Sequence, residues 1–161
     1  MAALLSGITL TSAGLGAVHG FAAPLGANFP VPHGTVCAAL LPHVIRENVA
    51  AFRAHPSESA ARGLARYAGV GRLLAGDVCL PDDESIDQAT RATADLAASL
   101  DIPPLSEFGL GQAHVPAMVA LSRKASSMRF NPIALSDESL AAALTAAIRG
   151  RHGLSAENCP A

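Results

Sequence analysis

The chain has 161 residues, of which half are apolar and 15% are charged, and its formal net charge is −2. This length corresponds to a single domain, and the near-neutral charge offers no basic surface for nucleic acid or an anionic membrane. A composition so poor in charge favours either a surface that another domain or subunit covers, or an alanine-rich core beneath an ordinary surface. We expect no nucleic-acid or membrane partner, and a homo-oligomer.

The cysteines and the N-terminal segment indicate a cytoplasmic protein. Cys37, Cys79 and Cys159 are widely spaced and odd in number, which is typical of reduced thiols and not of a disulfide framework. The apolar residues 1–18 lack a basic leader and are broken by serine, threonine and glycine. They predict a buried helix, in preference to a signal peptide or a membrane span.

Helical spacing of apolar residues predicts the first two helices, over residues 2–13 and 33–54. Between them we expect a loop, because prolines and glycines crowd this stretch and interrupt a regular helix. The residues concerned are Pro24, Gly26, Pro30 and Pro32.

Capping signals predict the middle of the chain. Ser57 is a candidate N-cap for a helix that runs to about residue 68, where glycines interrupt the pattern. The acidic residues 82–84 are expected to form a solvated turn. Ser85 and Gln88 then fit a capping box at the start of a helix that ends near residue 100.

Two further helices are predicted after residue 110. One begins near Gln112 to Pro116 and ends at about residue 127, and the other is capped by Ser136 and stopped by Gly150. No strand pattern of useful length occurs. We therefore predict an all-α helical bundle of six or seven helices over residues 1–150, followed by a frayed tail over residues 151–161.

Two histidines stand out as candidate metal ligands. His19 and His33 lie fourteen positions apart in AGLGAVHGFAAPLG and PHGTVCAALLPHV. A neutral imidazole is a good ligand for Fe(II) or Zn(II), and a returning loop would bring the two rings together. The spacing alone also fits two unrelated histidines. Cys37, one helical turn after His33, is either a further zinc ligand or a buried free cysteine.

Other motifs carry little chemistry. Gly14 and Gly16 open a Gly-x-Gly pattern, but no strand precedes it and the third glycine is missing, so it is no dinucleotide fingerprint. Asp82 to Glu84 could bind a cation, although a solvated turn is the preferred interpretation. The remaining histidines are expected to be structural, capping or surface residues, namely His43, His55, His114 and His152.

The two histidine segments resemble the metal-site region of the iron-containing (group III) alcohol dehydrogenases. The later stretches SLDIPPLSEFG, MVALSRKASSMRFNPIALSDESL and AAALTAAI are similar to the C-terminal helical domain of that family. The resemblance implies that His19 and His33 bind the catalytic divalent metal. Ala23 stands where many members have another histidine, so the resemblance does not extend to a histidine-dependent proton relay.

The resemblance also implies an activity. The metal, Fe(II) or Zn(II), would act as a Lewis acid on an alcohol oxygen, and hydride would pass to NAD or NADP to give an aldehyde or ketone. Phe21, Pro24 and Leu25 would then line the apolar wall of the substrate pocket. Reduction of maleylacetate-like acids is a further activity within the family.

In that family, an aspartate, a third histidine and the nucleotide-binding loop lie upstream of the matched region. We therefore expect this chain to lack the N-terminal nucleotide-binding domain, and alone to bind metal weakly and to be inactive. A separate N-terminal polypeptide or second subunit would complete a split enzyme. The alternative is a non-catalytic helical remnant or interaction module.

Overall fold

The computed structural model describes residues 1, 4–5, 7–8 and 14–150. Within these residues the chain forms six α-helices and three short 3₁₀ helices and contains no strand, which confirms the predicted all-α class. The α-helices are α2 (Ala17–Asn28), α3 (His33–Ala54), α4 (Glu58–Ala75), α5 (Asp82–Ser99), α6 (Val115–Arg123) and α7 (Asp137–Arg149). The 3₁₀ helices are η1 (Leu105–Phe108), η2 (Gln112–His114) and η3 (Ser126–Phe130).

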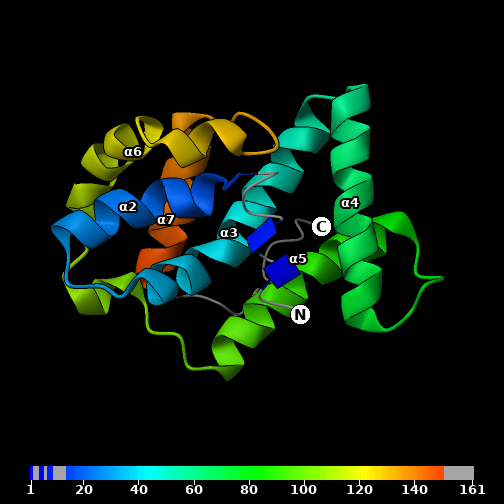
Figure 1. Cartoon of the computed structure of the whole chain (residues 1–161), viewed down its shortest axis with the longest axis horizontal. Helices are drawn as coiled ribbons and strands as arrows, with labels where there is room; N and C mark the ends of the chain where they lie inside the picture. Colours follow the sequence, from blue (N-terminus) through cyan, green and yellow to red (C-terminus); the bar gives the residue numbers. More distant parts are fainter. Residues whose placement is uncertain (2–3, 6, 9–13, 151–161) are drawn as a thin grey trace, which may run out of the picture.

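The long helix α3 connects two parts of the molecule (Figure 1). It packs against α2 and α7, and α6 lies on α2. At its C-terminal end it packs against α4 and α5, which also pack extensively on each other. The last described helix, α7, thus packs against α3, an early helix of the chain.

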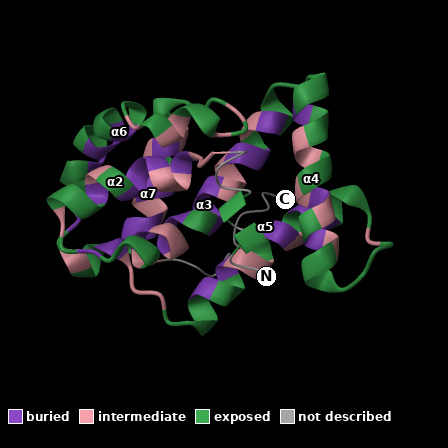
Figure 2. Cartoon of the chain, viewed as in Figure 1, coloured by how far each residue is buried: buried purple, intermediate pink, exposed green. Residues whose placement is uncertain are grey.

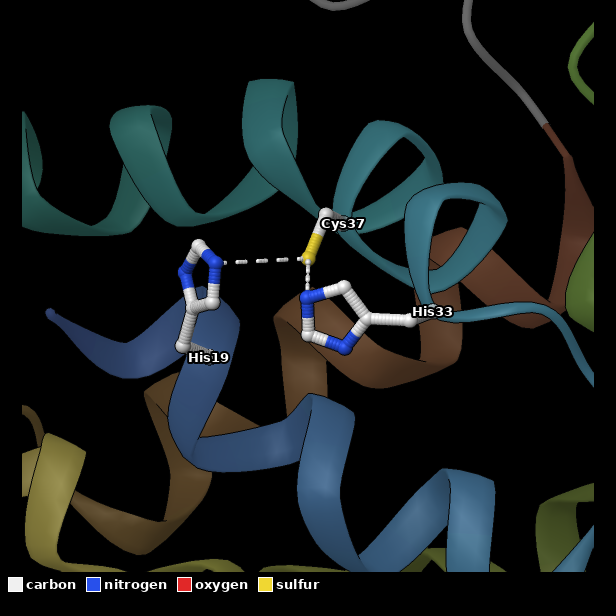
Figure 3. Close-up of side chains that lie close together, drawn as sticks. All are labelled: His19, His33 and Cys37. Carbon is white, nitrogen blue, oxygen red and sulfur yellow. Dashed lines mark hydrogen bonds between the residues drawn. The ribbon is translucent and has the colours of Figure 1, made fainter. Parts of the chain in front are cut away.

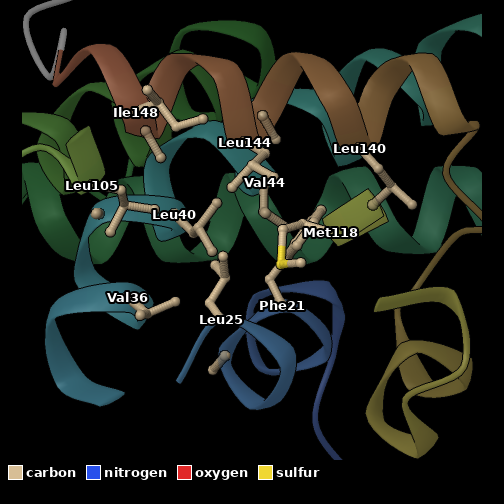
Figure 4. Close-up of a cluster of buried hydrophobic side chains, with 14 of the residues drawn as sticks. Phe21, Leu25, Val36, Leu40, Val44, Leu105, Met118, Leu140, Leu144 and Ile148 are labelled. Atoms are coloured by element: carbon tan, nitrogen blue, oxygen red, sulfur yellow. The ribbon is translucent and has the colours of Figure 1, made fainter. Parts of the chain in front are cut away.

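The main hydrophobic core lies where α2, α3, α6 and α7 meet (Figure 4). Its largest fully buried side chains include Phe21 and Leu25 of α2, Leu40 of α3, and Leu140 and Leu144 of α7. Because α2 contributes two of these residues, burial of its apolar face holds it firmly against the rest of the domain.

A smaller cluster joins α3, α4 and α5 at the other end. Val49, Ala68 and Ile86 are its buried members. Gly71 of α4 permits the close approach of α5, because a Cβ atom at this position would lie 1.7 Å from the carbonyl oxygen of Ser85.

Several predicted helix ends are confirmed. The α3 helix covers residues 33–54 as expected. Ser57 Oγ accepts a hydrogen bond of 3.0 Å from the backbone N–H of Ala60, and Ser136 Oγ accepts one of 3.1 Å from that of Ser139. Gly150 ends α7 in the left-handed conformation, with φ of 66°, which glycine adopts without steric cost.

The predicted loop before residue 33 was largely wrong. A continuous helix, α2, extends through Pro24, and only residues 29–32 form the connection. Proline removes one helical hydrogen bond and crowds the carbonyl four residues earlier, here that of Gly20. The burial of Phe21, Ala22 and Leu25 outweighs this local cost.

The predicted capping box at Ser85 was also wrong. The helix α5 begins earlier, at Asp82, so the acidic residues 82–84 form its first turn, where negative charge is favourable. Ser85 lies inside the helix, and its hydroxyl donates to the carbonyl oxygens of Leu80 and Pro81. Likewise, α4 continues through Gly69 and Gly71 to Ala75.

Large apolar side chains remain exposed on the outer parts of α4 and α5, the region drawn mostly as exposed in Figure 2. They include Val70, Leu73, Leu74, Leu96 and Leu100. Residues 4–5 and 7–8 are helical, as expected, but Leu4, Leu5 and Ile8 are exposed and not buried. The rest of the expected N-terminal helix and the expected tail over residues 151–161 lie outside the described residues. Among the described helices, none has the length and apolarity needed to cross a membrane.

Candidate metal centre

His19, His33 and Cys37 converge at the surface where α2 meets the start of α3 (Figure 3). The centroids of the two imidazole rings are 5.3 Å apart. Cys37 Sγ lies 3.8 Å from His19 Nε2 and 3.6 Å from His33 Nε2. One nitrogen or sulfur donor from each of the three residues lies within 4.8 Å of the other two. This set of donors fits a divalent transition metal or zinc.

The connection between the helices explains how His19 and His33 meet. His19 lies near the start of α2 and His33 is the first residue of α3. Phe29 and Pro32, which flank the connection, have extended dihedral angles. Extended backbone covers about 3.3 Å per residue against 1.5 Å in a helix, so a short connection returns the chain along α2 (Figure 1). Cys37 then follows His33 by one turn of α3.

The start of α2 is fixed by a distant residue. Gly16, its N-cap, offers no side-chain hydrogen bond. Asn131 Oδ1 instead accepts a hydrogen bond of 3.0 Å from the backbone N–H of Ala17. Asn131 therefore caps the helix that carries His19, two residues from the histidine itself.

Glycines allow η3 and the residue after it to approach α2 closely. A Cβ atom at Gly14 would lie 2.5 Å from the ring of Phe130, and one at Gly20 would lie 2.8 Å from Met128. Gly14 also has φ of 72°, a conformation that glycine adopts readily. The glycines that flank His19 thus have a packing role.

The same asparagine extends into a polar network toward the second cluster. Asn131 Nδ2 donates to Asn48 Oδ1 at 2.7 Å and to the carbonyl oxygen of Ile133 at 2.8 Å. Asn48 Nδ2 in turn donates to the hydroxyl of Tyr67 at 3.1 Å. Sequence reasoning missed this network, since no local pattern links Asn131 to residue 17.

Burial changes the protonation of the site. Partial burial lowers the pKa of His19, and the neighbouring His33 lowers this pKa further. Both effects favour the neutral imidazole, the form that binds metals. Burial raises the pKa of the Cys37 thiol. His33 is exposed, whereas His19 and Cys37 are half-buried.

The structure corrects the expected substrate-pocket wall. Phe21 and Leu25 have no exposed surface and belong to the main core, where α2 packs against α3 and α6. Pro24 is half-buried, and Ala23 is exposed. Neither Phe21 nor Leu25 lines an accessible surface of this chain.

The other histidines lie away from the three donors of the metal centre. His43 is buried within α3, while His55 and His114 are exposed. His114 Nδ1 accepts a hydrogen bond of 3.0 Å from the backbone N–H of Gly111, which confirms a capping role. His152 lies outside the described residues.

Comparison with known proteins identifies the family. A model of the Fe-containing alcohol dehydrogenase family, C-terminal domain, matches residues 1–148. The chain belongs to this family. The relatives of this alcohol dehydrogenase domain include 1,3-propanediol dehydrogenase of Klebsiella pneumoniae, 30% identical over 143 residues, which are 88% of this chain and 34% of that protein. Lactaldehyde reductase of Escherichia coli (strain K12) is 36% identical over 118 residues, which are 71% of this chain and 28% of that protein.

A solved structure agrees with the family assignment. The crystal structure of a 1,3-propanediol oxidoreductase superposes with a TM-score of 0.70 at 27% identity, over 83% of this chain and 32% of that one. The alcohol dehydrogenase domain described here thus spans about a third of the length of the relatives it matches.

Proposed function

We propose that this domain is the metal-binding half of an alcohol–aldehyde oxidoreductase, and that it holds a catalytic divalent metal through His19 and His33. One observation carries the proposal. In a member of the alcohol dehydrogenase family, imidazoles from two different helices lie with ring centroids 5.3 Å apart at the surface. A divalent metal bound there would supply a Lewis acid that polarises the oxygen of an alcohol or aldehyde.

The fold of this chain is proposed to hold the His19 and His33 ligands in place before the metal binds. Burial of the apolar face of α2 and the cap from Asn131 hold the backbone beside His19. His33 is held at the first turn of α3, whose next turns are anchored by Val36 and Leu40 in the core. A site fixed in this way loses little conformational entropy on binding, which favours affinity.

The nicotinamide cofactor, NAD or NADP, is proposed to bind elsewhere in the complete protein. The described residues contain no strand, so they offer no strand–turn–helix cradle for a pyrophosphate. The substrates are proposed to be short alcohols and aldehydes, since the relatives include a 1,3-propanediol dehydrogenase and a lactaldehyde reductase. The free thiols of Cys37 and Cys79 fit a reducing, cytoplasmic setting.

The proposal is tested first with the 161-residue chain alone, assayed with Fe(II) or Zn(II), NAD or NADP, and 1,3-propanediol. We expect no turnover, because hydride transfer needs the nicotinamide held against the substrate, and loss of such positioning forfeits about 7–11 kcal/mol. Reproducible turnover that disappears in His19→Ala would show that the chain builds a complete active site, contrary to the division proposed here.

The second test joins this chain to the N-terminal part of the Klebsiella pneumoniae 1,3-propanediol dehydrogenase in place of the matched region. The chimera should retain one divalent metal and reduce or oxidise short substrates. His33→Ala should lose both metal and turnover, whereas His55→Ala, an exposed histidine distant in sequence, should keep both. A folded chimera whose metal content is unchanged in the double variant His19→Ala/His33→Ala would favour a non-catalytic interaction module.

A further inference from the structure

We propose that Cys37 is a third metal ligand, so that His19, His33 and Cys37 form a zinc site of three donors within this chain. The inference rests on the proposed function in one respect, because it uses the same two histidines. It adds a soft sulfur donor that the sequence alone left as one of two alternatives.

The geometry of the cluster matches the edges of a zinc coordination polyhedron. With Zn–S of about 2.3 Å and Zn–N of about 2.0–2.1 Å, a tetrahedral site places its sulfur about 3.6 Å from each nitrogen. Cys37 Sγ lies 3.6 Å from His33 Nε2 and 3.8 Å from His19 Nε2. In Figure 3 both rings turn the same nitrogen, Nε2, toward the sulfur. One zinc ion can therefore reach all three donors with only small movements of the side chains.

Hydrogen bonds alone would hold these three side chains together only weakly. The Cys37 thiol can donate its S–H to one imidazole nitrogen and accept an N–H from the other, but sulfur is a weak donor and a weak acceptor, and it stands at similar distances from both nitrogens. The approach of Cys37 to His33 follows from their spacing of four residues on α3, but His19 belongs to α2, so its approach to the sulfur is not a consequence of local helix geometry. A shared metal satisfies all three donors at once.

The donor set also indicates which metal the site prefers. A thiolate together with two imidazoles is a common environment for zinc, whereas hard cations such as Mg²⁺ prefer oxygen ligands. His33 is exposed, so the solvent side of the site is open to further ligands from the rest of the protein or from water. On binding, Cys37 releases its thiol proton to the solvent.

The test measures metal binding by the whole 161-residue chain. Zn(II) is titrated against a chromophoric chelator, and Co(II) is added separately as a spectroscopic probe. Wild type should bind one equivalent, and the Co(II) form should show a thiolate-to-metal charge-transfer band. Cys37→Ser should lose this band and bind Zn(II) at least about tenfold more weakly. Mutation of a residue that only holds a metal ligand in place already lowers metal affinity by about 10–100-fold. Circular dichroism of each variant checks that the helices remain.

Matched controls separate the outcomes. Cys79→Ser and Cys159→Ser remove the other two cysteines and should leave affinity and spectrum as in wild type. Equal Zn(II) affinity and an unchanged Co(II) spectrum in Cys37→Ser, together with loss of binding in His33→Ala, would overturn the role of Cys37 while leaving the histidine site intact. Absence of Zn(II) binding by the wild-type chain would overturn the three-donor site outright, whereas the chimera tests the histidines independently.

Discussion

The backbone amide of Ala17 donates a hydrogen bond to the side chain of Asn131, a residue 114 positions later in the chain. This contact caps α2 two residues before His19, and the same asparagine also donates to Asn48 of α3. Asn131 therefore ties together the two helices that carry the candidate metal ligands. The metal centre is built on these long-range contacts as much as on the local sequence around the histidines.

Asn131→Ala should destabilise the domain and weaken metal binding together. The variant removes the acceptor of the Ala17 amide and the donor to Asn48 Oδ1, and unsatisfied partly buried groups cost about 1–3 kcal/mol. Chemical denaturation measures the free energy of unfolding, and a Zn(II) titration measures affinity. Asn28→Ala is the control, because it removes an exposed hydrogen bond to the carbonyl of Pro24. It should change the free energy of unfolding by no more than about 0.5 kcal/mol, and an equal effect of both variants would contradict the account.

Two glycines on one helix should respond to alanine in opposite directions. A Cβ atom at Gly71 would collide with the Ser85 carbonyl oxygen, whereas one at Gly69 meets nothing within 4 Å. Gly71→Ala must push α4 and α5 apart and should cost at least about 1–3 kcal/mol. Gly69→Ala should stabilise the protein by about 0.5–1 kcal/mol, since alanine loses less backbone entropy in a helix. Thermal denaturation of both variants decides, and stabilisation by Gly71→Ala would be inconsistent with this packing.

Phe21→Ala tests whether this side chain belongs to the core or to a substrate pocket. Phe21 has no exposed surface, and truncation of a buried phenylalanine costs about 3–5 kcal/mol. The urea midpoint should therefore fall sharply. A variant that unfolds at the wild-type midpoint would restore Phe21 as a candidate for the pocket wall.

Tyr67 should make the free energy of unfolding fall as the pH rises into the alkaline range. Burial raises the pKa of its phenol, and the hydrogen bond from Asn48 lowers this pKa by a lesser amount. Because the folded pKa exceeds the ordinary value near 10, the contribution to stability is fully present below that value and is lost as pH rises through the folded pKa. Tyr67 is the only tyrosine, so phenolate absorbance follows it alone. Half-titration at the same pH in the native and the urea-unfolded chain would disprove the shift.

Local signals predicted those helices whose ends depend on neighbouring residues. Ser57 and Ser136 cap helices as expected, since the hydroxyl and the amide that it accepts from are three residues apart. Pro24 misled the prediction, because its cost inside a helix is local while the burial of Phe21 and Leu25 that outweighs it is tertiary. The prediction that Ser85 is an N-cap was wrong because α5 starts a turn earlier, at Asp82.

The candidate site was predicted in part. The sequence marked His19 and His33, and the spacing of four residues between His33 and Cys37 placed these two on one face of a helix. It did not show that the sulfur faces His19 as well, because this depends on the path of residues 29–32 between the helices. The role of Asn131 depends on a contact across 114 positions, for which a single sequence carries no signal.

His19 and His33 are proposed to share one metal ion. Anomalous diffraction at the zinc absorption edge, on crystals of the zinc-loaded 161-residue chain, tests it most directly. We expect a single strong peak at the junction of α2 and α3, about 2.0–2.1 Å from a ring nitrogen of each histidine. A peak bound to only one of these histidines, or located elsewhere on the domain, would contradict it.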